Sequence, residues 1–296
     1  MRKITVLLMV IVVSNKVMGQ SAPASDSIKG NNHKLAPWFV ERCRLSAGYM
    51  SAVNNTDIKV GATIGGVGTD IDFEKDLGFD KQIGTFMVNF QWRISRRSRF
   101  DFSYLQFNRS STKTLDRTIQ FGDNTYNVSA NVSSFFNTTI YRASWGYALL
   151  AKPKAELGFL IGTHTLQTSV GMGIKTAAGS LTSNQNFNFT APLPDLGIWG
   201  GVSLNNRLAL NGEFNYLAIN TGDVSGQIVG YNAVLMYQAT KHVDLSLGYT
   251  GFNFKVDANV NSNKAHIGWG YNGPSITAGF SFGKKAWAHS FSSKSL

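Results

Sequence analysis

The chain has little cysteine and no long apolar run in its main part, and each shortage excludes a class of protein. Cys43 is the only cysteine among 296 residues. An intrachain disulfide and a thiolate metal cluster are therefore excluded as sources of stability. After residue 20 no stretch approaches the ~20 apolar residues that a membrane-spanning helix needs. The sequence therefore predicts no helical membrane domain there.

Acidic side chains are also scarce, with 17 Asp and Glu against 28 Lys and Arg, which gives a net charge of +11. Such an excess could indicate nucleic acid or anionic lipid as a partner. The basic residues lie in short clusters, such as Arg96-Arg97 with Arg99 and Lys284-Lys285, without the single dense patch of a nucleic-acid binder. We therefore expect no nucleic-acid partner.

The first nineteen residues predict a secretory signal peptide. Arg2 and Lys3 precede an unbroken apolar run over 4–13, and small or aliphatic residues occupy 17–19, where a signal peptidase reads the chain. Ten apolar residues are too few to cross a bilayer core of ~30 Å as a helix, so a membrane anchor is the weaker interpretation. Residues 20–37 are small and polar and predict an arm or linker.

From residue 38 onward, apolar side chains recur at every second position in segments of about ten residues. This period is typical of strands with two unlike faces, and no helical stripe of similar length competes with it. The predicted strands are Trp38 to Met50, Gly84 to Ile94, Arg99 to Phe107, Tyr141 to Leu149, Ala155 to Thr165, Asp195 to Leu204, Arg207 to Ala218, Val229 to Tyr237, Val243 to Tyr249 and Ser275 to Phe282.

The connections between these segments alternate between tight turns and long links. The tight turns are Ser95 to Ser98, Lys152 to Lys154, Asn205-Asn206 and Thr240 to His242, and the long links are 51–83, 108–140, 166–194, 219–228 and 250–274. Short turns at one end and long loops at the other are typical of bacterial outer-membrane barrels, in which the short turns are periplasmic. We therefore predict an all-β fold, a transmembrane antiparallel up-and-down β-barrel of ten strands over 38–283. The arm 20–37 and a basic tail, 284–296, would both be periplasmic.

Eight or twelve strands are alternatives, and a further hairpin at Asp57 to Phe73 would make twelve. A secreted sandwich or jelly roll also alternates, but it covers its apolar face with a second sheet. Here the apolar faces carry aromatic residues near strand ends, as an interfacial girdle does. These aromatics are Trp92, Trp145, Tyr147, Tyr216, Tyr237, Tyr249 and Phe282.

The opposite faces collect charged side chains that would point into the lumen. They are Arg42, Arg44, Arg93, Asp101, Arg142, Asp195, Glu213 and Asp244. Such charges could line a narrow aqueous path, or they could form a hydrogen-bonded plug, since small barrels are often filled by their own side chains. A ten-stranded barrel favours the plug and a twelve-stranded one the pore.

Turn positions also predict which residues face one another. The Ser95 to Ser98 turn places Arg93 opposite Asp101, and the Lys152 to Lys154 turn places Trp145 opposite Phe159. In RLALNGEFNYLAI the alternation directs Glu213 into the lumen, near Trp199 or Gly197 across the Asn205-Asn206 turn.

An outer-membrane lipid hydrolase is the rival class, because a serine nucleophile needs an adjacent base. Only His164 and His266 could approach the outer face, and neither is tied to a serine or a carboxylate by local spacing. We therefore expect no enzyme, no catalytic residues, no cofactor and no metal. Asp70, Asp72, Glu74 and Asp76 could form a calcium-binding edge, but they lack the EF-hand pattern, and a solvated hairpin strand is the favoured interpretation.

Four stretches resemble a family of Gram-negative outer-membrane β-barrel proteins that has no established ligand or reaction. They are TDIDFEKDLGF (69–79), IQFGDNTYNVSANVSSFF (119–136), APLPDLGIWGG (191–201) and YNGPSITAGFSF (271–282). The resemblance implies an outer-membrane location and a barrel fold. It also implies that the barrel-assembly machinery recognises the final strand through Phe280 and Phe282, although the tail that follows departs from the family pattern.

These observations lead to an expected monomer surrounded by outer-membrane lipid. The expected function is structural, or passage of small solutes through a narrow channel. A surface-exposed binding or adhesion barrel is the alternative, because strand-like residues flank a predicted hairpin tip at 122–124 and could form a ribbon beyond the membrane.

Overall fold

The computed structural model describes residues 35–59, 68–176, 181–220, 224–260, 263–285 and 287–289. The predicted signal peptide and most of the predicted arm lie outside the described residues. Within them, no helix is long and apolar enough to cross a membrane.

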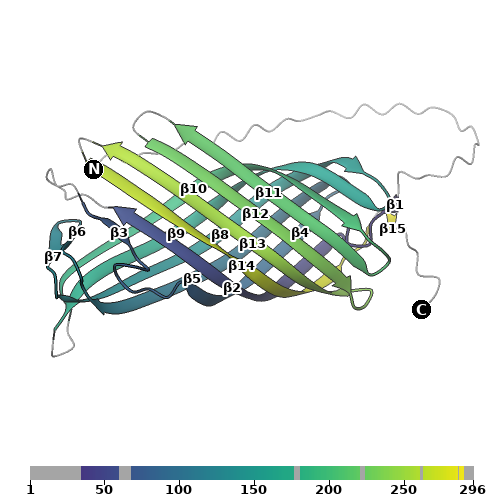
Figure 1. Cartoon of the computed structure of the whole chain (residues 1–296). Helices are drawn as coiled ribbons and strands as arrows, with labels where there is room; N and C mark the ends of the chain where they lie inside the picture. Colours follow the sequence, from purple (N-terminus) through teal and green to yellow (C-terminus); the bar gives the residue numbers. More distant parts are fainter. Residues whose placement is uncertain are drawn as a thin grey trace, which may run out of the picture. The chain divides into compact units, whose positions relative to one another are not determined.

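Ten antiparallel strands form one sheet that closes on itself, because β14 pairs with β2. The wall strands are β2 (Cys43–Lys59), β4 (Gln82–Arg93), β5 (Ser98–Thr114), β8 (Asn131–Ala151), β9 (Ala155–Lys175), β10 (Leu181–Ser203), β11 (Leu208–Asn220), β12 (Val224–Gln238), β13 (Val243–Val260) and β14 (Asn263–Phe282). The prediction of a ten-stranded barrel is confirmed (Figure 1).

Five short strands lie at the two ends of this barrel. β3 (Asp70–Asp72) pairs with the last residues of β2, so the predicted hairpin at 57–73 exists without adding two wall strands. β6 (Ile119–Phe121) and β7 (Asn124–Tyr126) form a hairpin whose tip is the predicted one, with Gly122 at a positive φ of 62°. β1 (Leu35–Ala36) and β15 (Ala288–His289) pair in parallel at the opposite end (Figure 1).

The prediction that Arg93 lies opposite Asp101 is wrong by two residues. Arg93 pairs with Arg99, and Gln91 pairs with Asp101. The Ser95 hydroxyl accepts from the backbone N–H of Ser98 at 3.0 Å, which closes a tighter turn than the one predicted. Because a shift of two preserves which side each residue faces, the two faces of β4 and β5 are as predicted.

The predicted pairing of Trp145 with Phe159 is also wrong by two residues. Trp145 lies opposite Ile161, and the register between β8 and β9 shifts between Ala148 and Leu150. Leu149 is the extra residue of this bulge and is 64% exposed. Ala151 pairs with Glu156, so the turn lies further along the chain than the predicted pairing required, and the bulge then shifts the partners by only one residue.

The outward face of the periplasmic half is apolar and aromatic. Large side chains such as Phe86, Leu247 and Ile198 are 74%, 60% and 58% exposed. A continuous apolar surface of this kind is stable in contact with lipid. Because the barrel is closed, this apolar band contains no unpaired strand edge. Phe280 and Phe282 belong to this band at the end of β14, and their rings stack at 6.0 Å.

The polarity of the two faces inverts halfway along the strands. In the outer half, inward side chains such as Phe107, Phe136 and Trp269 are at most 1% exposed. Outward side chains there are amides and hydroxyls, as in Asn108 on β5 and Thr190 on β10, both exposed. β8, β9 and β10 have 21, 21 and 23 residues, and a membrane requires only about 9–11 per strand. Their outer halves therefore project beyond the bilayer.

Two prolines mark where the wall divides above the membrane. β10 pairs with β11 only from Leu196 onward, although β10 and β9 stay paired up to Leu181. The carbonyl of Leu193 faces β9, where it accepts from the Thr163 hydroxyl. Pro192 and Pro194, at the alternate positions, therefore face β11 and offer it no N–H. The APLPD segment thus ends the pairing of these two strands.

Candidate functional site in the barrel lumen

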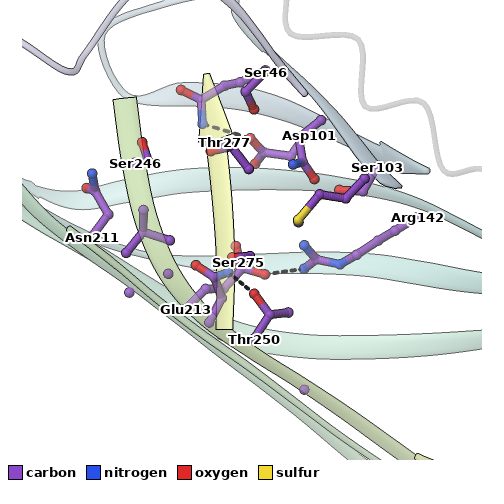
Figure 2. Close-up of a pocket in the computed structure, with 18 of the residues that line it drawn as sticks. Ser46, Asp101, Ser103, Arg142, Asn211, Glu213, Ser246, Thr250, Ser275 and Thr277 are labelled. Atoms are coloured by element: carbon purple, nitrogen blue, oxygen red, sulfur yellow. Dashed lines mark hydrogen bonds and ion pairs between the residues drawn. The ribbon is translucent and has the colours of Figure 1, made fainter. Parts of the chain in front are cut away.

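A polar cavity of about 270 Å³ occupies the lumen of the barrel. It is lined by inward side chains of nearly all the wall strands, many of them hydroxyls (Figure 2). Within the described lumen, five arginines face five carboxylates. The arginines are Arg44, Arg93, Arg96, Arg99 and Arg142, and the carboxylates are Asp101, Glu156, Asp195, Glu213 and Asp244.

Glu213 on β11 lies at the centre of this network and points into the lumen as predicted, opposite Trp199, which is one of its two predicted neighbours. One carboxylate oxygen lies 2.5 Å from Nη2 of Arg142, and the other lies 3.5 Å from Nη2 of Arg99. The Asn215 amide donates to it at 2.9 Å. The carboxylate therefore joins cations from two different strands, β5 and β8. Figure 2 shows Glu213 together with Arg142.

Glycines create the space in which this network packs. A Cβ placed on Gly146 or Gly158 would lie 2.9 Å from the Trp199 indole. The indole can therefore lie inside the lumen, where the Arg99 guanidinium stacks on it at 3.7 Å from the ring centroid. Such a cation–π contact contributes more when it is desolvated.

Two further ion pairs lie nearer the periplasmic end. Arg93 is 1% exposed and contacts Glu156 at 2.5 Å, and Glu156 also contacts Arg96 at 2.8 Å. Arg44 makes two contacts with Asp244, at 2.5 and 2.9 Å. Burial makes an unpaired charge costly, so each pair holds its strands in register.

Asp195 and His164 form the weakest part of the network. The Asp195 carboxylate is fully buried, 3.6 Å from Nδ1 of His164 and 3.5 Å from Arg142. Both distances exceed a normal hydrogen bond. The His164 ring packs against Phe252, with centroids 4.7 Å apart.

The outer end of the cavity is sealed by an apolar cluster. Phe107, Phe136, Trp269 and Tyr271 meet there with ring centroids 4.9 to 5.6 Å apart. They belong to a cluster that also contains buried residues of the 71–79 segment and of the β6–β7 hairpin.

A buried ion pair ties the 71–79 segment into that seal. The carboxylate of Glu74 bonds the guanidinium of Arg109, and it also accepts from the backbone N–H of Thr56 at 2.9 Å. Arg109 donates to the Thr56 hydroxyl at 2.6 Å and lies 5.1 Å from the Phe79 ring centroid.

The periplasmic end is sealed by a second apolar cluster. Trp38, Phe39 and Val40 precede β2 and pack with Trp287 of the tail, beside Met236. The Trp287 indole donates to the carbonyl of Val40 at 2.9 Å. The region predicted as the first strand thus begins with a plug, since β2 starts only at Cys43.

The predicted lumen residues divide into those that the fold brings together and one that it does not. Asp101, Arg142, Asp195 and Glu213 belong to the central network, and Arg44, Asp244 and Arg93 form the flanking pairs. Arg42 does not belong, because it lies before β2 and donates to the carbonyl of Ile94 at 2.6 Å.

Sequence reasoning missed Arg99, Glu156 and the buried pair Arg109–Glu74. Arg99 shares the side of Asp101 on β5, and Glu156 shares the side of His164 on β9, so strand alternation could have found both. No local signal marks Glu74, because its burial depends on a loop that folds back into the barrel.

The two histidines proposed for an outer face are separated. His164 is buried near the middle of β9, because that strand continues ten residues past its predicted end. His266 is near the outer end of β14, 2.6 Å from Asp257. Among the described residues, no serine is hydrogen-bonded to either ring.

The four carboxylates considered as a calcium-binding edge have partners within the protein. Asp70 contacts Lys59 and Asp76 contacts Arg117, while Asp72 accepts from the N–H of Lys75. Glu74 is buried, which corrects the expectation of a solvated strand. No group of three or more His, Cys, Asp and Glu in the described part is arranged to hold a metal ion.

No family model and no curated protein matches the chain. Among solved structures it is similar to the outer membrane protease OmpT from Escherichia coli, with a TM-score of 0.50 and 10% identity over 82% of this chain and 98% of that chain. Ail of Yersinia pestis (TM-score 0.32, 11% identity, 81% of this chain and 97% of that one) and the toluene transporter TodX of Pseudomonas putida (0.35, 9%, 86% and 95%) also match. At 10% identity the likeness to OmpT shows the fold alone. This fold and the outward apolar band together make the protein an outer-membrane β-barrel of the Gram-negative type.

Proposed function

We propose that this protein is a closed outer-membrane barrel that acts by binding at the cell surface. Its lumen serves as a structural core, without conduction and without catalysis. The observation that carries the proposal is the pair of apolar seals, one at each end of a small polar cavity. Both seals are formed by the chain itself.

The lumen network supports a permanently closed state. The five arginines of the network, which are buried or half-buried, have carboxylate partners, so no net charge within the described lumen draws an ion inward. Removing one partner of a buried pair costs about 3–5 kcal/mol, whereas the intact pair need not be stabilising relative to apolar residues. A path wide enough for solutes would separate several such pairs at once.

The outer half supports the binding role. It has a buried apolar core and a polar outward face, as a water-soluble barrel does. Since the strands extend far beyond the length that a membrane requires, the extra residues build a folded surface outside the cell. The additional folded surface therefore favours a role in recognition outside the cell.

The experiment is single-channel recording of the purified full-length protein in planar bilayers. We expect no openings in concentrated KCl at applied voltages up to about ±150 mV. As a positive control, a variant with Phe39, Trp287, Phe136 and Trp269 all changed to Ala removes parts of both seals and should produce openings. Heat-dependent gel mobility checks that each barrel is folded. Resolved openings of the wild-type protein would refute the closed barrel.

The polar cavity favours one second candidate, a narrow channel for small solutes that opens when both seals move. Swelling of proteoliposomes in small neutral solutes distinguishes the two. A closed barrel gives the rate of protein-free liposomes, whereas a gated channel gives faster swelling that falls with solute size.

A further inference from the structure

The outward face of β5, β8, β9 and β10 carries rows of side chains that change character with height. One row across the four strands is apolar, and consists of Phe100, Trp145, Ile161 and Leu196. Higher up, two successive rows are made of amides and hydroxyls. They are Gln106, Thr139, Gln167 and Thr190, and then Asn108, Asn137, Ser169 and Asn188.

These two rows line a shallow, open groove of about 440 Å³ on the surface. None of the side chains that line it is charged, although the chain as a whole carries a net charge of +11. The charged residues of β5 at this height, Arg109 and Lys113, occupy the alternate, inward positions and make ion pairs. The groove is therefore polar and neutral.

The next row supplies an aromatic ring beside the amides. Phe135 on β8 faces outward, partly exposed, and lies next to Gly171 on β9. A Cβ on Gly171 would come within 2.5 Å of the Phe135 ring and 2.1 Å of the Asn186 side chain. Glycine therefore lets both side chains lie close over the sheet.

The chemistry of this surface fits an uncharged oligosaccharide. Asn and Gln each present donors and an acceptor, and Ser and Thr hydroxyls present both, which matches the paired donor and acceptor character of sugar hydroxyls. A partly exposed aromatic ring provides an apolar platform for the C–H face of a sugar ring. The absence of cations in the groove disfavours phosphate or carboxylate groups as the bound part.

The height of the groove identifies where such a sugar would come from. Tyr104 and Tyr141, whose rings are 5.5 Å apart, are the last outward aromatics below the groove. Tyrosine is typical of the membrane–water interface. Gln106 follows Tyr104 by two residues, or about 7 Å of strand. The groove therefore begins at the level of the head groups of the outer leaflet.

We propose that this neutral face of β5, β8, β9 and β10 binds the uncharged sugar units of a glycolipid in the outer leaflet of the same membrane. The proposal rests on the proposed surface-binding function and names its ligand. The wall already contacts lipid directly below, so the groove continues an existing interface upward.

The test is a titration of full-length protein in detergent micelles with two probes. One is lipopolysaccharide with a long uncharged polysaccharide, and the other is deep-rough lipopolysaccharide, which lacks it. We expect at least tenfold tighter binding of the first. The variant Phe135→Ala, Gln167→Ala, Asn188→Ala should lose about tenfold on that probe alone, which is about 1.4 kcal/mol.

The matched control is Asn253→Ala, which removes an exposed outward amide from β13, away from the groove. It should bind both probes as the wild type does. Equal affinity of the wild type for the two probes, or an equal loss in Asn253→Ala, overturns the proposal while the closed barrel stands. Conductance by the wild type would refute the closed barrel and would leave this titration to be judged on its own result.

Discussion

Replacing Glu213 tests whether the lumen network is a structural core. Glu213→Ala leaves Arg142 and Arg99 without their shared carboxylate in a site where each side chain is at most 16% exposed. Loss of one partner of a buried pair costs about 3–5 kcal/mol. Because Arg142 still has Asp195 at 3.5 Å and Arg99 still has Asp101 at 2.8 Å, we expect the lower end, about 3 kcal/mol.

The conservative change Glu213→Gln keeps an acceptor for Arg142 and loses only the charge. It should cost about 1.5 kcal/mol, the lower value for a hydrogen bond to a charged group. The assay is urea unfolding of the refolded barrel in lipid vesicles, followed by tryptophan fluorescence. A slope of about 3 kcal/mol per molar would turn the alanine effect into a midpoint shift of about 1 M.

Two controls decide whether this reasoning holds. Gln227→Ala removes an exposed side chain of β12 and should change stability by less than about 0.5 kcal/mol. The double variant Arg142→Met, Glu213→Ala should cost much less than the sum of its single changes. A Glu213→Ala effect below about 1 kcal/mol, or strict additivity in the double variant, would refute the structural role of the network.

Three further changes probe packing, the periplasmic seal and pH. Gly158→Ala places a Cβ 2.4 Å from a backbone oxygen of Tyr147 and should cost about 1–3 kcal/mol in urea unfolding, whereas Gly212→Ala, with 3.6 Å of room, should be near neutral. Trp287→Ala should cost about 3 kcal/mol and expose the tail to trypsin, and an unchanged cleavage rate would contradict the seal. Burial raises the pKa of Glu41 above its ordinary 4.5, against the opposing effect of Lys285. Its contribution to stability is therefore present below pH 4.5 and is lost as pH rises, so the unfolding midpoint of Glu41→Gln relative to the wild type should increase between pH 4 and pH 7.

Strand alternation was enough to predict which side of the wall the charged residues within the strands occupy, whereas Arg42, which lies before β2, was placed wrongly. Glu213 was placed in the lumen near Trp199 or Gly197 because a strand has a period of two, and any register error of two residues preserves the face. Pairing partners were less predictable. The two-residue errors at Arg93 and at Trp145 both came from the position of the turn, which the hydrophobic pattern does not record.

Strand ends were underestimated for a physical reason. Strands were predicted from apolar residues at outward positions. Above the membrane that signal is absent, because the outward positions are occupied mainly by Asn, Gln, Ser and Thr. The stretch 166–175 therefore looked like a loop, although it continues β9 with Leu166 and Val170 facing inward. The apolar seal above the cavity was missed for the same reason, since Phe136, Trp269 and Tyr271 lay in predicted loops and only Phe107 lay in a predicted strand.

The inversion of polarity carries functional information that neither half of the barrel carries alone. Below the Tyr104–Tyr141 pair the wall is solvated by hydrocarbon and its polar groups face inward, so the charges must neutralise one another inside. Above that pair water is the solvent, so the apolar residues turn inward and close the lumen. The same change of solvent therefore sets the outer seal and leaves a neutral polar face outside. A barrel built in this way closes its pore because its outer half folds as a soluble protein does, and the side chains available for recognition are those on its outer surface.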